Sequence, residues 1–171
     1  MTARRALIVA AAAALAIGCS RARVAGDSPW VAEAERRHAL ADERLQAGDR
    51  PGALRALREI VDGHTDIAAG VPANDRRGVL QDTYFRLAEL DLQAGDAGAA
   101  LASADRGLAL GRADDLFVAN LLVVRGAAHQ ALGDGPTAAA DYHEALVIND
   151  KLLAEAVHEQ GDASGAPGAR P

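Results

Sequence analysis

The side chains that could do acid–base or metal chemistry gather near the end of the chain. His129, Asp141, Tyr142 and His143 carry imidazole, carboxylate and phenol groups that could bind zinc or transfer protons. We favour the simpler interpretation, in which His129 is a packed imidazole bonded to a neighbour and His143 is exposed. The sequence contains no His-Glu-x-x-His, Gly-x-Ser-x-Gly or Cys-x-x-Cys pattern and no glycine-rich phosphate loop. We therefore predict no enzymatic activity, no metal and no cofactor, and an enzyme with a site near His129 is the weakest alternative.

Charge and cysteine content exclude further classes of function. The formal net charge is −6, and Lys151 is the one lysine among 18 basic residues, with no basic run that could neutralise a phosphate backbone. Nucleic acid is therefore not an expected partner. The single cysteine, Cys19, excludes an internal disulfide and a multi-cysteine metal site.

The start of the chain has the layout of an export signal. Arg4 and Arg5 precede an uninterrupted apolar run from Ala6 to Ile17. Twelve residues in a helix span about 18 Å, well short of the ~30 Å hydrocarbon core of a bilayer. The run therefore predicts a signal peptide rather than a membrane-spanning helix.

The segment Leu15-Ala16-Ile17-Gly18-Cys19 resembles the lipobox of bacterial lipoproteins. The resemblance implies that residues 1–18 are cleaved and that Cys19 becomes the lipidated first residue, carrying diacylglycerol and a fatty acid such as palmitate. Residues 19–28 would then be a short membrane tether. Because Ser20 rather than aspartate follows the cysteine, the same resemblance implies an outer-membrane location facing the periplasm. An ordinary secretory peptide with a chance cysteine is the alternative.

The composition predicts helices. Alanine supplies 42 of the 171 residues and aromatic residues only 3%, a balance that favours helix over strand. The Ser28-Pro29, Asn74-Asp75 and Asp114-Asp115 pairs are typical of helix N-termini. We expect an all-α fold in one domain.

A short turn pattern occurs three times, each time at the end of an amphipathic stretch: Leu45–Asp49, Leu92–Asp96 and the variant Gln130–Asp134. The glycine in each turn supplies the left-handed conformation that ends a helix. Five residues after each glycine stands an alanine, at positions 53, 100 and 138. The repeated unit is therefore a helix, a tight turn and a second helix.

These units resemble the tetratricopeptide repeat (TPR), a 34-residue helical hairpin, over roughly residues 34–148. The resemblance implies a short α-solenoid of three hairpins closed by a C-terminal capping helix. The expected ranges, within a domain spanning residues 29–160, are 29–63, 74–111 and 114–148 for the hairpins and 150–160 for the cap. The first helices should begin near Pro29, Asp75 and Asp115, and residues 161–171 should be a disordered tail.

Two departures from the repeat pattern involve charged or polar side chains. Arg125 occupies a place where the repeat has leucine. Arg44, Asp91 and His129 replace the aromatic residue that usually stands four residues before the turn glycine. We interpret the three as a solvated edge or as bridges between repeats, and a functional polar ladder is the alternative.

In this family the first helix of each hairpin lines an inner, concave face. Carried over position by position, the partner-binding residues are Glu35, His38, Asp42, Leu45, Gln46, Asp82, Phe85, Arg86, Glu89, Leu92, Gln93, Asn120, Val123, Val124, Ala127 and Gln130. This face is apolar and acidic, and it lacks the lysine and asparagine set with which some family members clamp a C-terminal carboxylate. An apolar or amphipathic helix with some basic residues fits it better. The alternative is that Phe85 merely packs between repeats.

The sequence therefore predicts a lipid-anchored protein of the cell envelope that acts as an adaptor or assembly factor by binding another envelope protein. The chief alternative is a homo-oligomeric structural spacer, because an alanine-rich core buries little surface and self-association could supply the missing stability.

Overall fold

The computed structural model describes residues 28–63 and 71–164, with side chains as far as Gln160. Within these ranges the chain forms helices and no strand: α1 (Pro29–Gln46), α2 (Arg50–Asp62), α3 (Ala73–Gln93), α4 (Ala97–Ala109), α5 (Leu116–Ala131) and α6 (Gly135–Ser164). The predicted all-α fold is confirmed. The predicted signal peptide, Cys19 and the tether up to residue 27 lie outside the described residues, as do 64–70 and 165–171.

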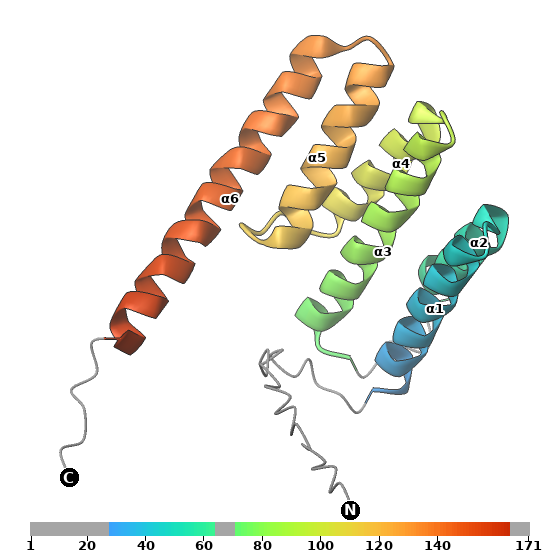
Figure 1. Cartoon of the computed structure of the whole chain (residues 1–171), viewed down its shortest axis with the longest axis horizontal. Coiled ribbons are helices and arrows are strands. Elements are labelled where there is room, and N and C mark those ends of the chain that lie inside the picture. The colour runs from blue at the N-terminus through green and yellow to red at the C-terminus, as the bar shows by residue number, and fades with distance from the viewer. Residues whose placement is uncertain (1–27, 64–70, 165–171) are drawn as a thin grey trace, which may run out of the picture.

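Three helical hairpins follow one another in series (Figure 1). The pairs α1–α2, α3–α4 and α5–α6 each pack together, and α3 also contacts α1 and α5. The first helices therefore form one layer, and the second helices pack behind them, as the resemblance to the tetratricopeptide repeat implies. The first helices begin within two residues of the predicted positions. No helix in the described ranges combines the length and hydropathy needed to cross a bilayer.

The three turns are built alike. Gly48, Gly95 and Gly133 have φ of +76°, +82° and +85°. The aspartate after each glycine donates its backbone N–H to the carbonyl oxygen five residues earlier, at 2.8–2.9 Å, which closes the first helix. The carboxylate of that aspartate then accepts the backbone N–H three residues later, at 2.9–3.2 Å, and caps the second helix. One Gly-Asp pair thus ends one helix and starts the next.

Small residues set how closely the helices approach. A Cβ atom on Gly107 of α4 would lie 2.7 Å from a methyl group of Leu121, and one on Gly126 of α5 would lie 2.8 Å from the ring of Tyr142. The alanines after the turns, Ala53 and Ala100, are fully buried. At the small positions of the repeat, larger side chains of the neighbouring helix therefore pack directly against the backbone.

The capping helix is not a separate element, which corrects its predicted start at residue 150. Helix α6 continues without a break from Gly135 to Ser164, so residues 161–164, which were expected in a disordered tail, are helical. The sequence from residue 137 to residue 160 contains neither glycine nor proline, so nothing interrupts the backbone hydrogen bonds. Ile148 and Leu152 also pack on one apolar cluster with Leu121 and Leu122, and a break between them would separate them.

Candidate functional site

Two cavities open between the first helices of the hairpins, and together we call them the groove. The α1–α3 pocket has a volume of about 370 Å³ and is lined by Ala41, Leu45, Gly48, Arg50, Leu57, Arg86, Glu89, Leu90 and Gln93. The α3–α5 pocket has a volume of about 280 Å³ and is lined by Phe85, Glu89, Leu92, Gln93, Asn120, Val123, Val124 and Ala127. Glu89 and Gln93, one turn apart on α3, border both pockets.

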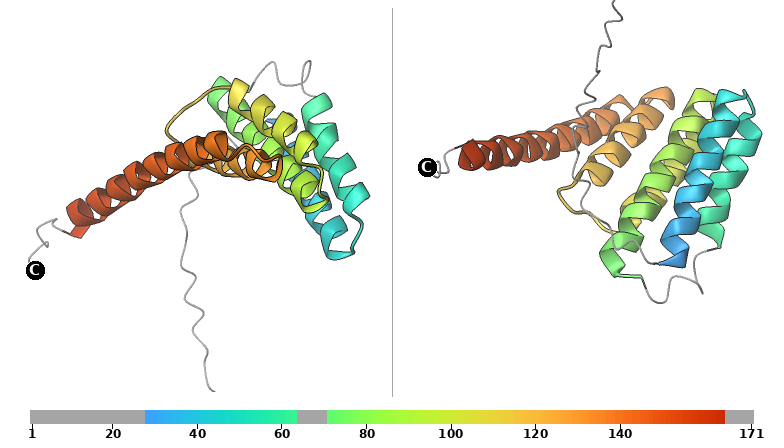
Figure 2. Two further views of the ribbon diagram at one scale, coloured as in Figure 1. Left: turned by 90° about the horizontal axis from the view of Figure 1, so that it is seen from above. Right: turned by 60° about the horizontal axis from the view of Figure 1, so that its bottom comes forward.

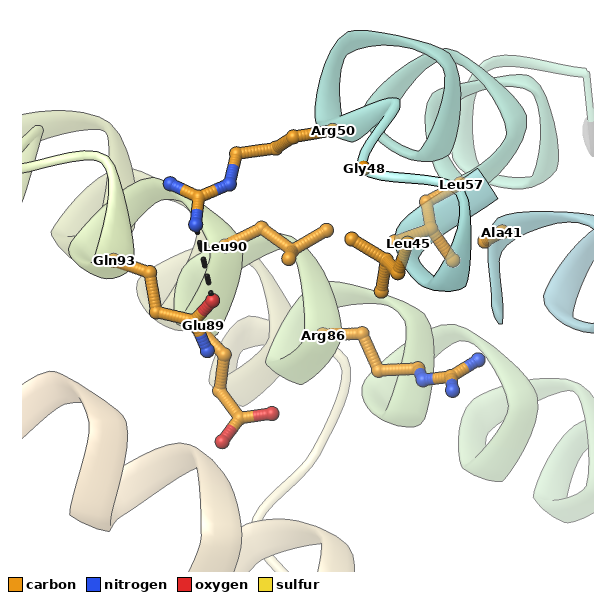
Figure 3. A pocket seen from close by; sticks show the side chains of 9 residues that line it. All are labelled: Ala41, Leu45, Gly48, Arg50, Leu57, Arg86, Glu89, Leu90 and Gln93. Atoms are coloured by element: carbon orange, nitrogen blue, oxygen red, sulfur yellow. Dashed lines mark hydrogen bonds between the residues drawn. The ribbon is translucent and has the colours of Figure 1, made fainter. Parts of the chain in front are cut away.

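The α1–α3 pocket has an apolar centre and charged ends. Leu45 and Leu90 point toward each other from α1 and α3, with Leu57 of α2 beside Leu45 (Figure 3). At one end Arg50 donates from Nη2 to Oε1 of Gln93 at 3.4 Å and joins α2 to α3. A ligand here would meet leucine side chains inside and hydrogen-bonding groups at the mouth.

A polar layer next to this pocket ties α1 to α3. Arg86 reaches across to donate to the carboxylate of Asp42. His38 Nε2 lies 2.9 Å from Oγ1 of Thr83, and His38 Nδ1 lies 3.6 Å from a carboxylate oxygen of Asp82. Burial lowers the pKa of the His38 imidazole, and the charge of Asp82 acts in the opposite direction.

The Asp82, His38 and Thr83 contacts place a carboxylate, an imidazole and a hydroxyl in a row. The Thr83 side chain, however, is fully buried and donates its proton to the carbonyl oxygen of Val79 at 2.8 Å. Its oxygen therefore accepts a hydrogen bond from His38, and no substrate can reach it. The row connects two helices and supplies no accessible nucleophile.

The α3–α5 pocket is the more apolar of the two. Phe85 and Leu92 on α3 are half-buried, while Val123 on α5 is 44% exposed although its neighbour Val124 is buried. Phe85 also packs against the buried clusters formed by α4, α5 and α6. The aromatic ring therefore packs between repeats and also borders the pocket, and its binding of a partner stays a prediction.

Glu89 is an isolated carboxylate between the two pockets. It has no hydrogen bond or ion pair with any residue that the structure describes. Figure 3 shows its side chain pointing away from both Arg50 and Arg86. Burial raises the pKa of Glu89, the Arg86 charge opposes this, and the Asp82 charge adds to it.

The structure groups most of the predicted partner-binding residues into two sets. Those on the far half of α3 line the pockets, together with Leu45 of α1 and with Asn120, Val123, Val124 and Ala127 of α5, whereas Glu35, Gln46 and Gln130 line neither pocket. His38, Asp42 and Asp82 instead form the polar layer between α1 and α3. Whether any of these residues binds a partner remains a prediction.

Sequence reasoning missed several residues of the α1–α3 pocket: Ala41, Gly48, Arg50, Leu57 and Leu90. Arg50 and Leu57 belong to the second helix of the hairpin, and Gly48 to the turn. The prediction carried over family positions on first helices alone. The Gly48-Asp49-Arg50 sequence was a usable signal, since the turn places Arg50 at the end of the neighbouring helix.

Three of the four residues considered for acid–base chemistry each have a separate partner. Tyr142 donates its hydroxyl proton to Oε1 of Gln130 at 3.1 Å, and Asp141 accepts from Arg125. Nδ1 of His129 lies 3.7 Å from the carboxylate of Asp134, and His143 is exposed. Among the described side chains no group of three or more His, Cys, Asp or Glu residues is arranged to hold a metal ion.

The three residues in the place of the usual aromatic differ from one another. Arg44 is exposed and lies 3.4 Å from the carboxylate of Asp49, just after the turn glycine. His129 makes the corresponding contact to Asp134, whereas Asp91 is buried. A solvated edge therefore describes Arg44 but not Asp91, for which a bridge between repeats stays the prediction.

Comparison with known proteins identifies no family. No protein-family model matches the chain, and no curated protein matches it. Among solved structures, the crystal structure of MamA protein is similar with 18% sequence identity and a TM-score of 0.36, over 81% of this chain and 98% of that chain. The all-α assignment of three stacked hairpins therefore rests on the helices and turns of this chain itself.

Proposed function

We propose that this protein is an adaptor that binds another protein through the groove along α1, α3 and α5. The observation that carries the proposal is the pair of adjacent cavities on one layer of helices, with Leu45 and Val123 exposed at their mouths. Helical segments bind in protein grooves by placing apolar side chains in pockets that are surrounded by polar residues. Stacked helical hairpins hold such a surface rigid without any cofactor.

We further propose that the adaptor is a lipoprotein of the cell envelope that helps a larger envelope complex assemble. The support is the lipobox-like segment ending at Cys19 and the apolar run before it. Acyl chains on Cys19 would hold the helical domain at the periplasmic surface of the outer membrane, since each buried CH₂ contributes about 0.8 kcal/mol.

The groove is tested by crosslinking in cells followed by mass spectrometry. The wild type is compared with Val123→Glu, which puts a charge at the mouth of the α3–α5 pocket, and with Leu146→Glu, which changes an exposed leucine on α6. We expect a second envelope protein to crosslink to the wild type and to Leu146→Glu but not to Val123→Glu. Equal crosslinking of all three would show that the groove is not the working surface.

The anchor is tested by metabolic labelling with an alkyne fatty acid. Label on the wild type that is lost in Cys19→Ser, together with a mature chain beginning at residue 19, is the expected result. An unlabelled mature chain would contradict the lipoprotein proposal but would not bear on the proposal that the groove binds a partner.

One observation favours a second candidate, the homo-oligomeric spacer. The far half of α6 extends beyond α5 and carries exposed Leu153 and Val157 (Figure 2). A second copy could cover these side chains. Light scattering on the wild type and on the double variant Leu153→Glu/Val157→Glu tests the spacer hypothesis. A wild-type dimer that becomes monomeric in the variant supports it, and a monomeric wild type contradicts it.

A further inference from the structure

Three charged residues line the two pockets of the groove, and Glu89 is the one acid among them. Arg86 is paired with Asp42, and Arg50 is bonded to Gln93. Glu89 has no such partner in the described part of the chain, and its exposed side chain stands where the two pockets meet. The carboxylate is therefore open to a ligand in either pocket, and a cation placed beside it would gain a direct ion pair.

Apolar surface flanks Glu89 on both sides. Toward α1 lie Leu45 and Leu90, and toward α5 lie Phe85, Leu92 and Val123. Neighbouring packed helices are about 8–10 Å apart, so the pockets on either side of α3 are separated by about one such distance. An occupant must therefore present an apolar group, a cation and a second apolar group within about 10 Å.

A helix meets this requirement better than an extended chain. Residues i, i+3 or i+4, and i+7 of a helix share one face and span about 10 Å at 1.5 Å per residue. Same-face residues of a strand stand about 6.6 Å or about 13 Å apart, so an extended chain either falls short of the second pocket or passes it.

We propose that the groove binds an amphipathic helix of a partner protein, with large apolar side chains in the two pockets and a lysine or arginine between them paired with Glu89. The inference rests on the proposed adaptor function and adds to it the chemistry of the partner. The charges of Glu89 and Asp82 act against an acidic helix in the same position, so Glu89 selects for basic partners.

The test is selection from a phage-displayed library of helical peptides on purified wild-type protein and on Glu89→Lys. Glu89 is exposed and makes no contact that holds the fold, so the charge reversal should leave the helical spectrum and urea midpoint unchanged. We expect wild type to select Lys or Arg three or four residues from a large apolar residue, and Glu89→Lys to select Asp or Glu there. The apolar positions should be the same in both selections.

Binding of one selected peptide then measures the pair. By fluorescence anisotropy, changing its basic residue to glutamate should weaken binding to wild type about tenfold or more, and Glu89→Lys should recover part of that loss. Glu89→Gln should bind the original peptide more weakly without favouring the acidic one.

Selection on Val123→Glu separates the inference from the function on which it rests. The selected peptides could fail to bind Val123→Glu and yet carry the same charged residues whether selected on wild type or on Glu89→Lys. That result would overturn the assignment of Glu89 and leave the groove as the binding surface. Peptides that bind Val123→Glu as well as wild type, or no selected peptide at all, would overturn both.

Discussion

Arg125 of α5 donates from Nε and Nη2 to the two carboxylate oxygens of Asp141 on α6, at 2.9 and 2.5 Å. Both side chains are largely buried, and Nη1 of Arg125 also lies 3.3 Å from Asp105 on α4. In the middle hairpin the corresponding positions, counted from the turn glycine, hold Leu87 and Ser103. The arginine in a leucine position is therefore matched by an aspartate in the facing helix.

This pairing predicts a pattern of stability. Arg125→Leu alone leaves the Asp141 carboxylate buried without a partner and should lower the free energy of unfolding by about 3 kcal/mol. The double variant Arg125→Leu/Asp141→Ser reproduces the pair of the middle hairpin and should recover most of the loss. Urea unfolding of both variants measures this, and a double variant no more stable than Arg125→Leu would contradict it.

The turn glycines are required for their backbone conformation. Gly95→Ala, at φ +82°, should lower the free energy of unfolding by about 1–2 kcal/mol. Gly98→Ala is the matched control, because Gly98 lies in α4 and a Cβ there would meet only Asp96, at 3.6 Å. Alanine should be neutral or stabilising at that position. Equal thermal midpoints for the two variants would argue against the conformational explanation.

Asp91 should make the protein less stable as pH rises. Burial raises the pKa of this carboxyl; the Arg58 charge opposes the rise and the Asp96 charge adds to it. The folded state then holds the proton more tightly than the unfolded state, so the free energy of unfolding falls as pH passes through the interval between the two pKa values.

Asp91→Asn removes this titration and should be more stable than wild type at about pH 7, with the difference shrinking toward about pH 4. Urea unfolding across that range measures it. A less stable variant at neutral pH would mean that attraction to Arg58 outweighs the cost of burial.

The far half of α6 should contribute little to the stability of a single copy. Leu153 and Val157 are 64% and 61% exposed, so Leu153→Lys/Val157→Lys should change the free energy of unfolding of the monomer by less than about 0.5 kcal/mol. Ile148→Ala on the same helix removes a buried side chain and should cost about 2–5 kcal/mol. If the wild type instead becomes more stable as protein concentration rises and the lysine variant does not, the difference would indicate self-association through α6.

Local features of the sequence determined the helices and turns. Gly48, Gly95 and Gly133 end helices because their φ values are positive, and the aspartate after each begins the next helix through its own carboxylate. Both effects act over three to five residues, so the repeated Gly-Asp pair could be interpreted without knowing what packs against it. The layer formed by the first helices followed from the same repetition.

Only the tertiary structure decided which charges are satisfied. Arg86 pairs with Asp42, 44 residues away, while Glu89, one turn further along α3, has no partner among the described residues. Arg125 and Asp141 likewise meet because α5 and α6 pack closely. These contacts depend on helix separation and rotation, which side chains from several helices set together, and no short stretch of sequence contains that information. The continuity of α6 has the same origin, since Ile148 and Leu152 are held by one shared cluster.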